Sequence, residues 1–246
     1  MLIVVPRKRI DSLLVTRGIA ESREKARAMV MSGDVFVDDV VVVKPGTLVK
    51  EDAHLRLQEG PKFVSRGGIK LERALDEFNV DVTSLVVLDV GASTGGFTDC
   101  LLKRGASRVY AVDVGYGQLD YRLRQDSRVI VMERVNARYP LDLPESVDLA
   151  TLDLSFISLE KVIPSVADAV KGGGRLIALV KPQFETERRQ VKKGGLVKAP
   201  QIHADVLGRF ISWAVNKGFR LGGIVPSPIL GADGNKEFFV YLNKPK

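Results

Sequence analysis

Cysteine, histidine and long apolar runs are scarce in this sequence of 246 residues. The single cysteine, Cys100, excludes an internal disulfide and any zinc cluster built on cysteines, so we expect it to be a small buried side chain and expect no metal site. No stretch of about 18 uncharged apolar residues occurs, which argues against a transmembrane helix. The first residues also lack the pattern of a secretory signal. These absences predict a cytoplasmic protein that does not act on membranes.

The remaining composition is that of an ordinary globular protein. Hydrophobic residues make up 45% and charged residues 27%, enough for one large domain or for a large and a small one. Lys and Arg number 37 against 30 Asp and Glu, a formal net charge of +7. This excess favours a polyanionic partner such as nucleic acid, although many basic proteins bind none.

The first 60 residues differ in pattern from the rest of the chain. Apolar residues at 10, 13, 14 and 15 predict a short helix that ends at Gly18, and Ser22 and Gly33 bracket a second helix. Short β-like pieces follow, separated by Asp, Pro and Gly. Residues 1–27 contain seven Lys or Arg (7, 8, 9, 17, 23, 25 and 27) against three acids (11, 21 and 24). Such a basic face can bind phosphates, although a solvated helix face has the same composition.

The stretch SREKARAMVMSGDVFVDDVVVVKPGTLV resembles the alpha-L RNA-binding module of a small-subunit ribosomal protein and of pseudouridine synthases. The shared pattern is Ser-Arg, an alanine, an apolar pair, a glycine, Val-x-Val-Asp and a Lys-Pro-Gly turn. It covers most of residues 7–60. The resemblance implies that RNA phosphates are contacted by Arg7, Arg9, Ser22, Arg23, Lys25 and Arg27, with Lys44 nearby.

A linker is expected at residues 61–67, where Pro61 and the Gly67-Gly68 pair interrupt any regular element, and residues 68–246 form the second domain. Here amphipathic helical patterns alternate with nearly continuous apolar runs. Helices are expected at 69–80, 96–105, 159–170 and 200–218, and strands at 84–91, 107–115, 128–133, 147–155, 172–184, 219–229 and 237–244. This order predicts an α/β fold with a Rossmann-like, mostly parallel sheet, an antiparallel last strand and helices on both faces, beside a small α+β domain.

The stretch VVLDVGASTGGFTD, residues 86–99, is typical of a strand, a turn and the start of a helix. A Walker-type phosphate loop would need Gly-Lys-Ser/Thr here, and a dinucleotide fingerprint would need glycine in place of Ser93. S-adenosylmethionine needs close backbone approach without a phosphate site and is favoured, with NAD as the alternative. Asp89 is expected to orient the turn and face an ammonium group, and Asp113 to hold ribose hydroxyls. Both acids could instead cap helices.

Four charged residues are expected to meet beside this turn. Asp153 and Lys181 end the fourth and fifth strands, and the carboxyl ends of parallel strands lie at one edge of a sheet. Lys70 lies on the first helix of the second domain and Glu237 at the start of the last strand. Together they resemble the K-D-K-E tetrad of FtsJ/RrmJ-type ribose 2′-O-methyltransferases, whose cofactor motif the glycine turn also resembles.

Five strings extend this resemblance to nearly the full length: RIDSLLVTRG, SRGGIKLERAL, LDVGASTGGFTDCLL, LDLSFISL and LVKPQFE. They are similar to the TlyA family. The resemblance implies an S-adenosylmethionine-dependent cytidine 2′-O-methyltransferase that acts on ribosomal RNA or ribosomal subunits. Family members have also been called haemolysins, so a membrane-active haemolysin is one alternative and an inactive RNA-binding scaffold is another.

The resemblance also implies roles for single residues. Lys181 would steer and help deprotonate the ribose hydroxyl, Asp153 would orient Lys181, and Lys70 and Glu237 would position the ribose. The expected cofactor contacts are Asp89, Gly91, Ala92, Ser93, Gly95, Gly96, Phe97, Thr98, Asp113, Val114 and Asn136. Asn136 would accept a hydrogen bond from the adenine amino group, unless it is only part of a surface turn. Arg66 and a basic loop with Lys192 and Lys193 are further expected RNA contacts, and the protein is expected to be a monomer.

Overall fold

The computed structural model describes residues 6–58, 60–187, 191 and 194–246. The chain forms two compact units, residues 1–62 and 63–246. Lys192 and Lys193, two of the predicted RNA contacts, lie outside the described residues. Among the described residues, no helix is both long and apolar enough to cross a bilayer.

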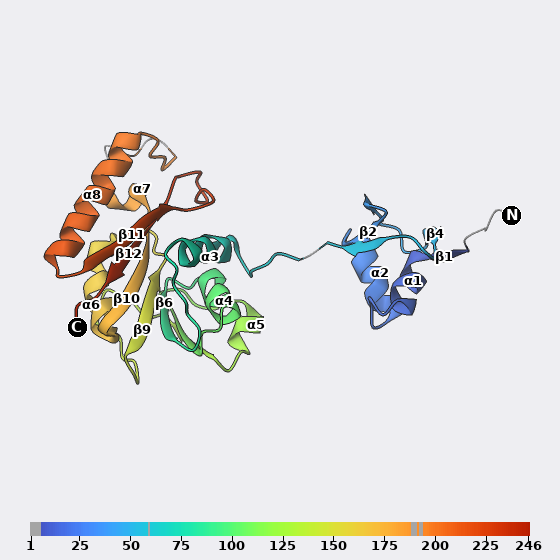
Figure 1. Cartoon of the computed structure of the whole chain (residues 1–246), viewed down its shortest axis with the longest axis horizontal. Coiled ribbons are helices and arrows are strands. Elements are labelled where there is room, and N and C mark those ends of the chain that lie inside the picture. Colours follow the sequence, from blue (N-terminus) through green and yellow to red (C-terminus); the bar gives the residue numbers. More distant parts are fainter. Residues whose placement is uncertain (1–5, 59, 188–190, 192–193) are drawn as a thin grey trace. The chain divides into compact units, whose positions relative to one another are not determined.

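The first unit is a pair of helices on small antiparallel sheets (Figure 1). Strand β1 (Arg7–Arg9) pairs with β4 (Leu48–Lys50), and β2 (Val35–Val37) lies between β3 (Val40–Val41) and β5 (Leu55–Leu57). Helices α1 (Ile10–Thr16) and α2 (Arg23–Met31) carry much of the core. Ser22 caps α2, as predicted, by accepting a hydrogen bond from the Lys25 amide. The basic run at 7–9 forms a strand that the sequence pattern does not predict.

The second unit is built on a seven-stranded sheet of order β11-β12-β10-β9-β6-β7-β8. Its strands are β6 (Val86–Val90), β7 (Arg108–Asp113), β8 (Val129–Glu133), β9 (Val147–Leu152), β10 (Val170–Val180), β11 (Arg220–Pro226) and β12 (Phe238–Asn243). The five strands from β10 to β8 are parallel, whereas β12 is antiparallel to both β10 and β11. The predicted mostly parallel sheet with an antiparallel last strand is therefore confirmed.

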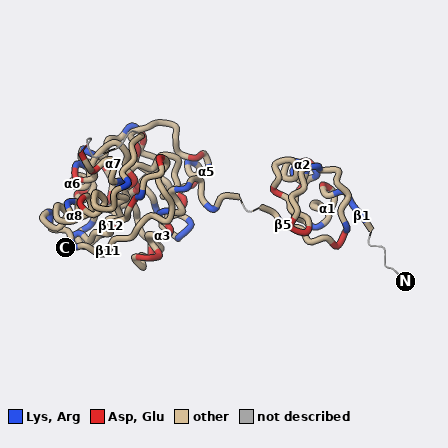
Figure 2. The backbone as a smooth tube through the Cα atoms, turned by 90° about the horizontal axis from the view of Figure 1, so that it is seen from above, with Lys and Arg blue, Asp and Glu red and all other residues tan. Residues whose placement is uncertain are grey.

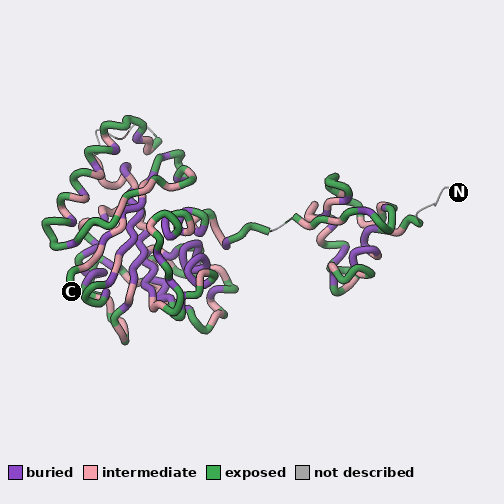
Figure 3. Tube along the Cα trace, viewed as in Figure 1, coloured by how far each residue is buried: buried purple, intermediate pink, exposed green. Residues whose placement is uncertain are grey.

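Helices cover both faces of this sheet (Figure 1). Apolar residues that alternate along the strands point into two cores, so Val87 packs with α3 (Arg66–Glu77) and α4 (Gly96–Lys103), whereas Leu88 packs with α6 (Ile163–Ala169). Helix α8 (Pro200–Asn216) joins the core of α6. Figure 3 shows the buried strands between their helical layers. This double cover explains the nearly continuous apolar runs in the sequence.

Three local features differ from the predicted pattern. Helix α3 begins at Arg66, so Gly67 and Gly68 lie in its first turn instead of breaking the chain. A short helix, α5 (Tyr121–Arg124), occurs where none is predicted. Residues 159–170, predicted as one helix, form a 3-10 turn (Leu159–Lys161) followed by α6. Pro164 at the start of α6 has no amide hydrogen to donate, which suits the first turn of a new helix.

Candidate catalytic site and cofactor cleft

The predicted glycine turn connects β6 to α4 and has no room for side chains at two of its glycines. Gly91 has a φ of +85°, and a Cβ there would lie 2.4 Å from the carbonyl oxygen of Asp153. Gly95, at the N-cap of α4, has a φ of +96°, and a Cβ there would lie 2.2 Å from Leu123. Glycine is therefore required by both backbone conformation and space.

Two hollows adjoin this turn and share Gly91, Ser93 and Asp153. The first, here called the catalytic cleft, has a volume of about 440 Å³. The second, here called the cofactor hollow, has a volume of about 520 Å³ and contains residues that follow β7 and β9. The two hollows lie at the carboxyl ends of the parallel strands, where open α/β sheets bind ligands.

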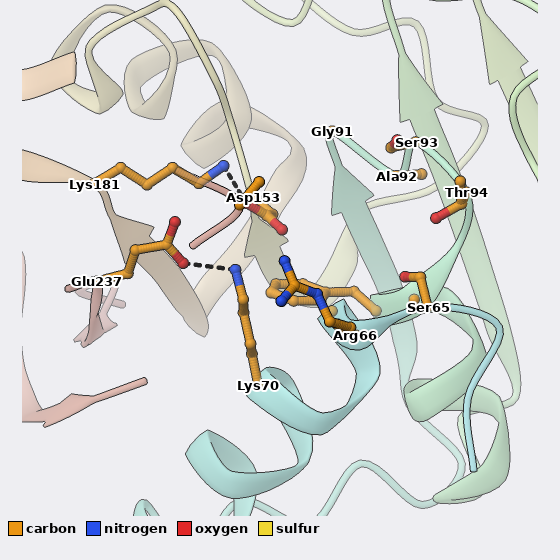
Figure 4. Close-up of a pocket in the computed structure, with 14 residues that line it drawn as sticks. Ser65, Arg66, Lys70, Gly91, Ala92, Ser93, Thr94, Asp153, Lys181 and Glu237 are labelled. Carbon is orange, nitrogen blue, oxygen red and sulfur yellow. Dashed lines mark hydrogen bonds and ion pairs between the residues drawn. The ribbon is translucent and has the colours of Figure 1, made fainter. Parts of the chain in front are cut away.

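The four predicted charged residues all line the catalytic cleft (Figure 4). The Lys70 ammonium lies 2.6 Å from a carboxylate oxygen of Glu237, and the Lys181 ammonium lies 2.7 Å from Asp153 Oδ1. Lys181 also donates a hydrogen bond to Ser155 Oγ at 2.9 Å. Each lysine thus faces a carboxylate from a different element.

These two ion pairs are nearly closed to solvent. The side chains of Lys70 and Glu237 are 10% and 3% exposed, and those of Lys181 and Asp153 are 11% and 22% exposed. Removing four charges from water is costly, and apolar side chains could fill the same space. The presence of both pairs in the lining of a cleft therefore indicates a role in chemistry rather than in stability.

The cofactor hollow has the features that a nucleoside needs. Asp113 lies at the end of β7, where its two carboxylate oxygens accept hydrogen bonds from the amides of Ser93 and Gly115. Val114 and Ile157 supply apolar walls, and Asn136 lies in the same lining. The Asn136 amide oxygen accepts a hydrogen bond from the Arg138 amide, so it also stabilises its own turn. These residues fit the ribose and adenine of S-adenosylmethionine.

Three of the predicted cofactor contacts, Asp89, Gly95 and Thr98, line neither hollow. Asp89 is completely buried and accepts hydrogen bonds from Thr98 Oγ1 at 2.7 Å and Thr151 Oγ1 at 3.0 Å. Through these contacts Asp89 connects β6 to α4 and β9 behind the turn. Gly95 packs against Leu123. Gly91, Ala92, Ser93, Gly96, Phe97, Asp113, Val114 and Asn136 do line the hollows.

Asp89 gives the fold a pH dependence that can be measured. Burial raises its pKa to about 6, with a further contribution from Asp153, against the lowering effect of the threonine hydrogen bonds. A carboxyl with a higher pKa in the folded state stabilises the fold at low pH, and this stabilisation is lost as pH rises through 6. We expect the unfolding free energy of the wild type, measured relative to Asp89→Asn, to fall by about 1 kcal/mol between pH 5 and pH 7.5. Chemical denaturation of both proteins at each pH checks this, and a constant difference would contradict it.

Sequence reasoning missed several residues around the two hollows. Ser155, which lines the cofactor hollow, accepts a hydrogen bond from the Lys181 ammonium, and Ser65 and Thr94 line the catalytic cleft. Ser155 lies two positions after Asp153 in the string LDLSF, which was a usable signal. Gly67 faces the same cleft. It does so because α3 starts earlier than the sequence pattern indicates.

The predicted RNA contacts of the first unit are solvent-accessible side chains on and around its helices. Arg7, Arg9, Arg23, Lys25, Arg27 and Lys44 are exposed, and Figure 2 marks the basic residues along β1 and α2. Arg9 and Arg23 both contact the buried carboxylate of Asp11. In the second unit, Arg66 is exposed and lines the catalytic cleft.

Two family models match the chain: the FtsJ-like methyltransferase model over residues 63–244 and the S4 domain model over residues 8–55. The protein YqxC of Bacillus subtilis is 49% identical over 97% of this chain and 86% of its own length. The 16S/23S rRNA (cytidine-2′-O)-methyltransferase TlyA of Mycobacterium tuberculosis is 43% identical over 96% of this chain and 90% of its own. A solved structure from Streptococcus thermophilus, described as a haemolysin, is 44% identical with a TM-score of 0.74, covering 99% of this chain and 90% of that one.

Proposed function

The chain belongs to the TlyA family of FtsJ-like methyltransferases, and we propose on this basis that it methylates the ribose 2′-hydroxyl of a cytidine in ribosomal RNA, with S-adenosylmethionine as the methyl donor. The observation that carries the proposal is the pair of lysine–carboxylate contacts beside the glycine turn, the buried Lys70–Glu237 and the partly buried Lys181–Asp153. These contacts place groups that can hold and deprotonate a ribose hydroxyl directly beside the hollow proposed for the methyl donor. A scaffold without activity would not need them.

For this reaction the protein must align the ribose hydroxyl with the methyl group and remove the proton of the hydroxyl. When bound, the cofactor supplies a reactive methyl group on a sulfonium. Lys181 and Asp153 would hold the attacking hydroxyl at the edge of the cofactor hollow. The hydroxyl proton would pass to the Lys181 nitrogen as that nitrogen gives a proton to the Asp153 carboxylate, 2.7 Å away. Lys70 and Glu237, paired across the cleft, hold the ribose through its other oxygens. Gly91 lets the backbone of the turn approach closely, since a side chain there would meet Asp153.

RNA delivery is the role we assign to the S4 domain, whose exposed arginines and lysines would contact phosphates. Arg66, on the rim of the catalytic cleft, would contact the strand near the target ribose. We place the reaction in the cytoplasm, on ribosomal RNA or ribosomal subunits.

A methyl-transfer assay tests the proposal directly. Purified protein, S-adenosylmethionine with a labelled methyl group and ribosomal subunits lacking the modification should give label in rRNA, and mapping should place it at the 2′-oxygen of a cytidine. Label on a base, or none on any subunit or free rRNA, would reject the proposal. Leakage of liposomes at the same protein concentration would favour the haemolysin function instead.

Asp11 in the S4 domain is an acid whose removal is expected to weaken RNA binding rather than strengthen it. Its buried carboxylate accepts a bidentate pair of hydrogen bonds from Arg9, at 3.1 and 2.8 Å, and lies 3.4 Å from Arg23 Nε. These guanidinium groups hold the pKa of Asp11 well below its usual range, so it stays charged. Because the carboxylate fixes both guanidinium planes, we expect Asp11→Asn to weaken RNA binding about tenfold, although it makes the protein more positive.

The matched control is Glu24→Gln, which removes one exposed acid from α2 and should leave RNA affinity unchanged or slightly higher. Titration of labelled rRNA at fixed salt measures both variants, and thermal unfolding checks that the domain stays folded. An increase in affinity for Asp11→Asn would show that charge alone, not positioning, governs this surface.

A further inference from the structure

A third hollow lies next to the catalytic cleft and has no part in the mechanism above. Its volume is about 480 Å³, and it is formed by the start of α8 and the connection between β11 and β12. Glu237 lines both the catalytic cleft and this hollow, so the two adjoin at this residue. We call it the flanking hollow.

The walls of the flanking hollow are held in place by hydrogen bonds of His203, which lines it, and of Asn235 and Val197, which precede the lining residues Lys236 and Lys198. The buried side chain of Asn235 accepts from the Val197 amide at 2.8 Å and donates to the Gly195 carbonyl at 2.9 Å. A His203 ring nitrogen contacts the Val197 carbonyl oxygen at 2.8 Å. The hollow is therefore formed before any ligand arrives, which lowers the entropy cost of binding.

The chemistry of the lining combines an apolar wall with a cationic rim. Ile229, Leu230 and Phe238 supply apolar surface beside several prolines, whereas Lys198 and Lys236 are exposed at the rim. Within the described part of the chain, neither lysine has an ion-pair partner. The acid in the lining, Glu237, is already paired with Lys70. The hollow therefore combines an apolar wall with two positive charges at its rim.

We propose that the flanking hollow binds the nucleotide next to the target cytidine on the same RNA strand. The base would lie against the apolar wall, and Lys198 and Lys236 would contact the phosphate that links it to the target. Glu237 joins the two sites, so a ribose held by Lys70 and Glu237 places its neighbour at this hollow. The inference rests on the proposed function, because it needs an RNA strand in the catalytic cleft.

Two kinds of variant test this site. Lys198→Ala combined with Lys236→Ala removes the cationic rim, and Ala204→Trp fills the hollow from the exposed surface of α8. The controls are Lys217→Ala and Ser212→Trp, exposed positions on or just after α8 that lie outside the lining. None of these residues lies in the catalytic quartet.

We expect the double lysine variant to raise the KM for rRNA about tenfold. It should also lower the slope of log affinity against log salt by about one, since both lysines contact one phosphate and each lost phosphate contact removes close to one unit. Ala204→Trp should weaken rRNA binding without that change in slope. The affinity for S-adenosylmethionine and the kcat at saturating RNA should stay within twofold, and both controls should match the wild type.

RNA binding is measured separately from turnover, so the two proposals can fail separately. Wild-type protein that binds rRNA but transfers no methyl group rejects the proposed function and leaves the hollow to be judged by binding alone. Unchanged KM, affinity and salt slope in the double variant would overturn the flanking-nucleotide site. So would a loss seen with intact subunits and absent with protein-free rRNA, because the occupant would then be a protein.

Discussion

A Lys181→Ala variant is expected to lose methyl transfer by about a thousandfold while its affinity for S-adenosylmethionine changes little. The Lys181 ammonium is 2.7 Å from Asp153 Oδ1 and lines the catalytic cleft, whereas it is absent from the lining of the cofactor hollow. Its removal takes away the group that holds the hydroxyl. It also leaves the carboxylate of Asp153 without the cation that it faces.

The matched control is Lys171→Ala. It removes a lysine near the start of β10, the strand that ends just before Lys181, and this lysine pairs with Asp148 at the surface. Single-turnover methylation and calorimetric titration of the cofactor measure the two effects, and thermal unfolding excludes misfolding. Turnover of Lys181→Ala within tenfold of wild type would contradict its assignment to the reacting hydroxyl.

Gly91→Ala is the second substitution with a large expected effect. The new methyl group would lie 2.4 Å from the Asp153 carbonyl oxygen, which is backbone and cannot swing away, and the φ of +85° disfavours alanine. Relief of this clash must displace either the glycine turn or Asp153. A shift of about 1 Å in a reacting group can cost roughly a hundredfold in rate, so we expect at least this loss together with weaker cofactor binding.

Gly117→Ala separates the two causes. Gly117 also has a positive φ, +72°, but nothing lies within 4 Å of a Cβ there. The Gly117→Ala variant should therefore lose about 1–2 kcal/mol of unfolding free energy from the backbone strain alone, and it should keep most of its activity. Equal losses of cofactor affinity in the two variants would show that strain, and not the contact with Asp153, accounts for the effect of Gly91→Ala.

The sheet and the charged quartet could be predicted from the sequence because both depend on simple geometry. Apolar runs separated by helices require a covered parallel sheet, and the carboxyl ends of its strands bring Asp153 and Lys181 together. The approach of Lys70 and Glu237 was suggested by family resemblance. The spacing alone could not supply it, since α3 and β12 are far apart in the chain.

The differences from the sequence-based expectations come from packing that the local pattern does not show. Gly67 and Gly68 look like chain breakers, but both lie in the first turn of α3, and the space at Gly68 is filled: a Cβ there would lie 2.2 Å from Phe63, and one at Gly96 on α4 would lie 2.9 Å from the Gly68 amide nitrogen. Asp89 looks like a ligand contact until Thr98 and Thr151, from two other elements, occupy its oxygens. The sequence around each residue shows neither the packing at Gly68 nor the hydrogen-bond partners of Asp89.

Glu237 enters the site from the first position before β12, which is hydrogen-bonded between β10 and the edge strand β11. Lys70, Asp153 and Lys181 come from parts of the fold that need not detach when this hairpin does. Edge elements open at a lower free energy than the centre of a sheet. Because β11 and β12 hold Glu237 in the site, we expect heating to abolish turnover while most of the helical circular dichroism persists.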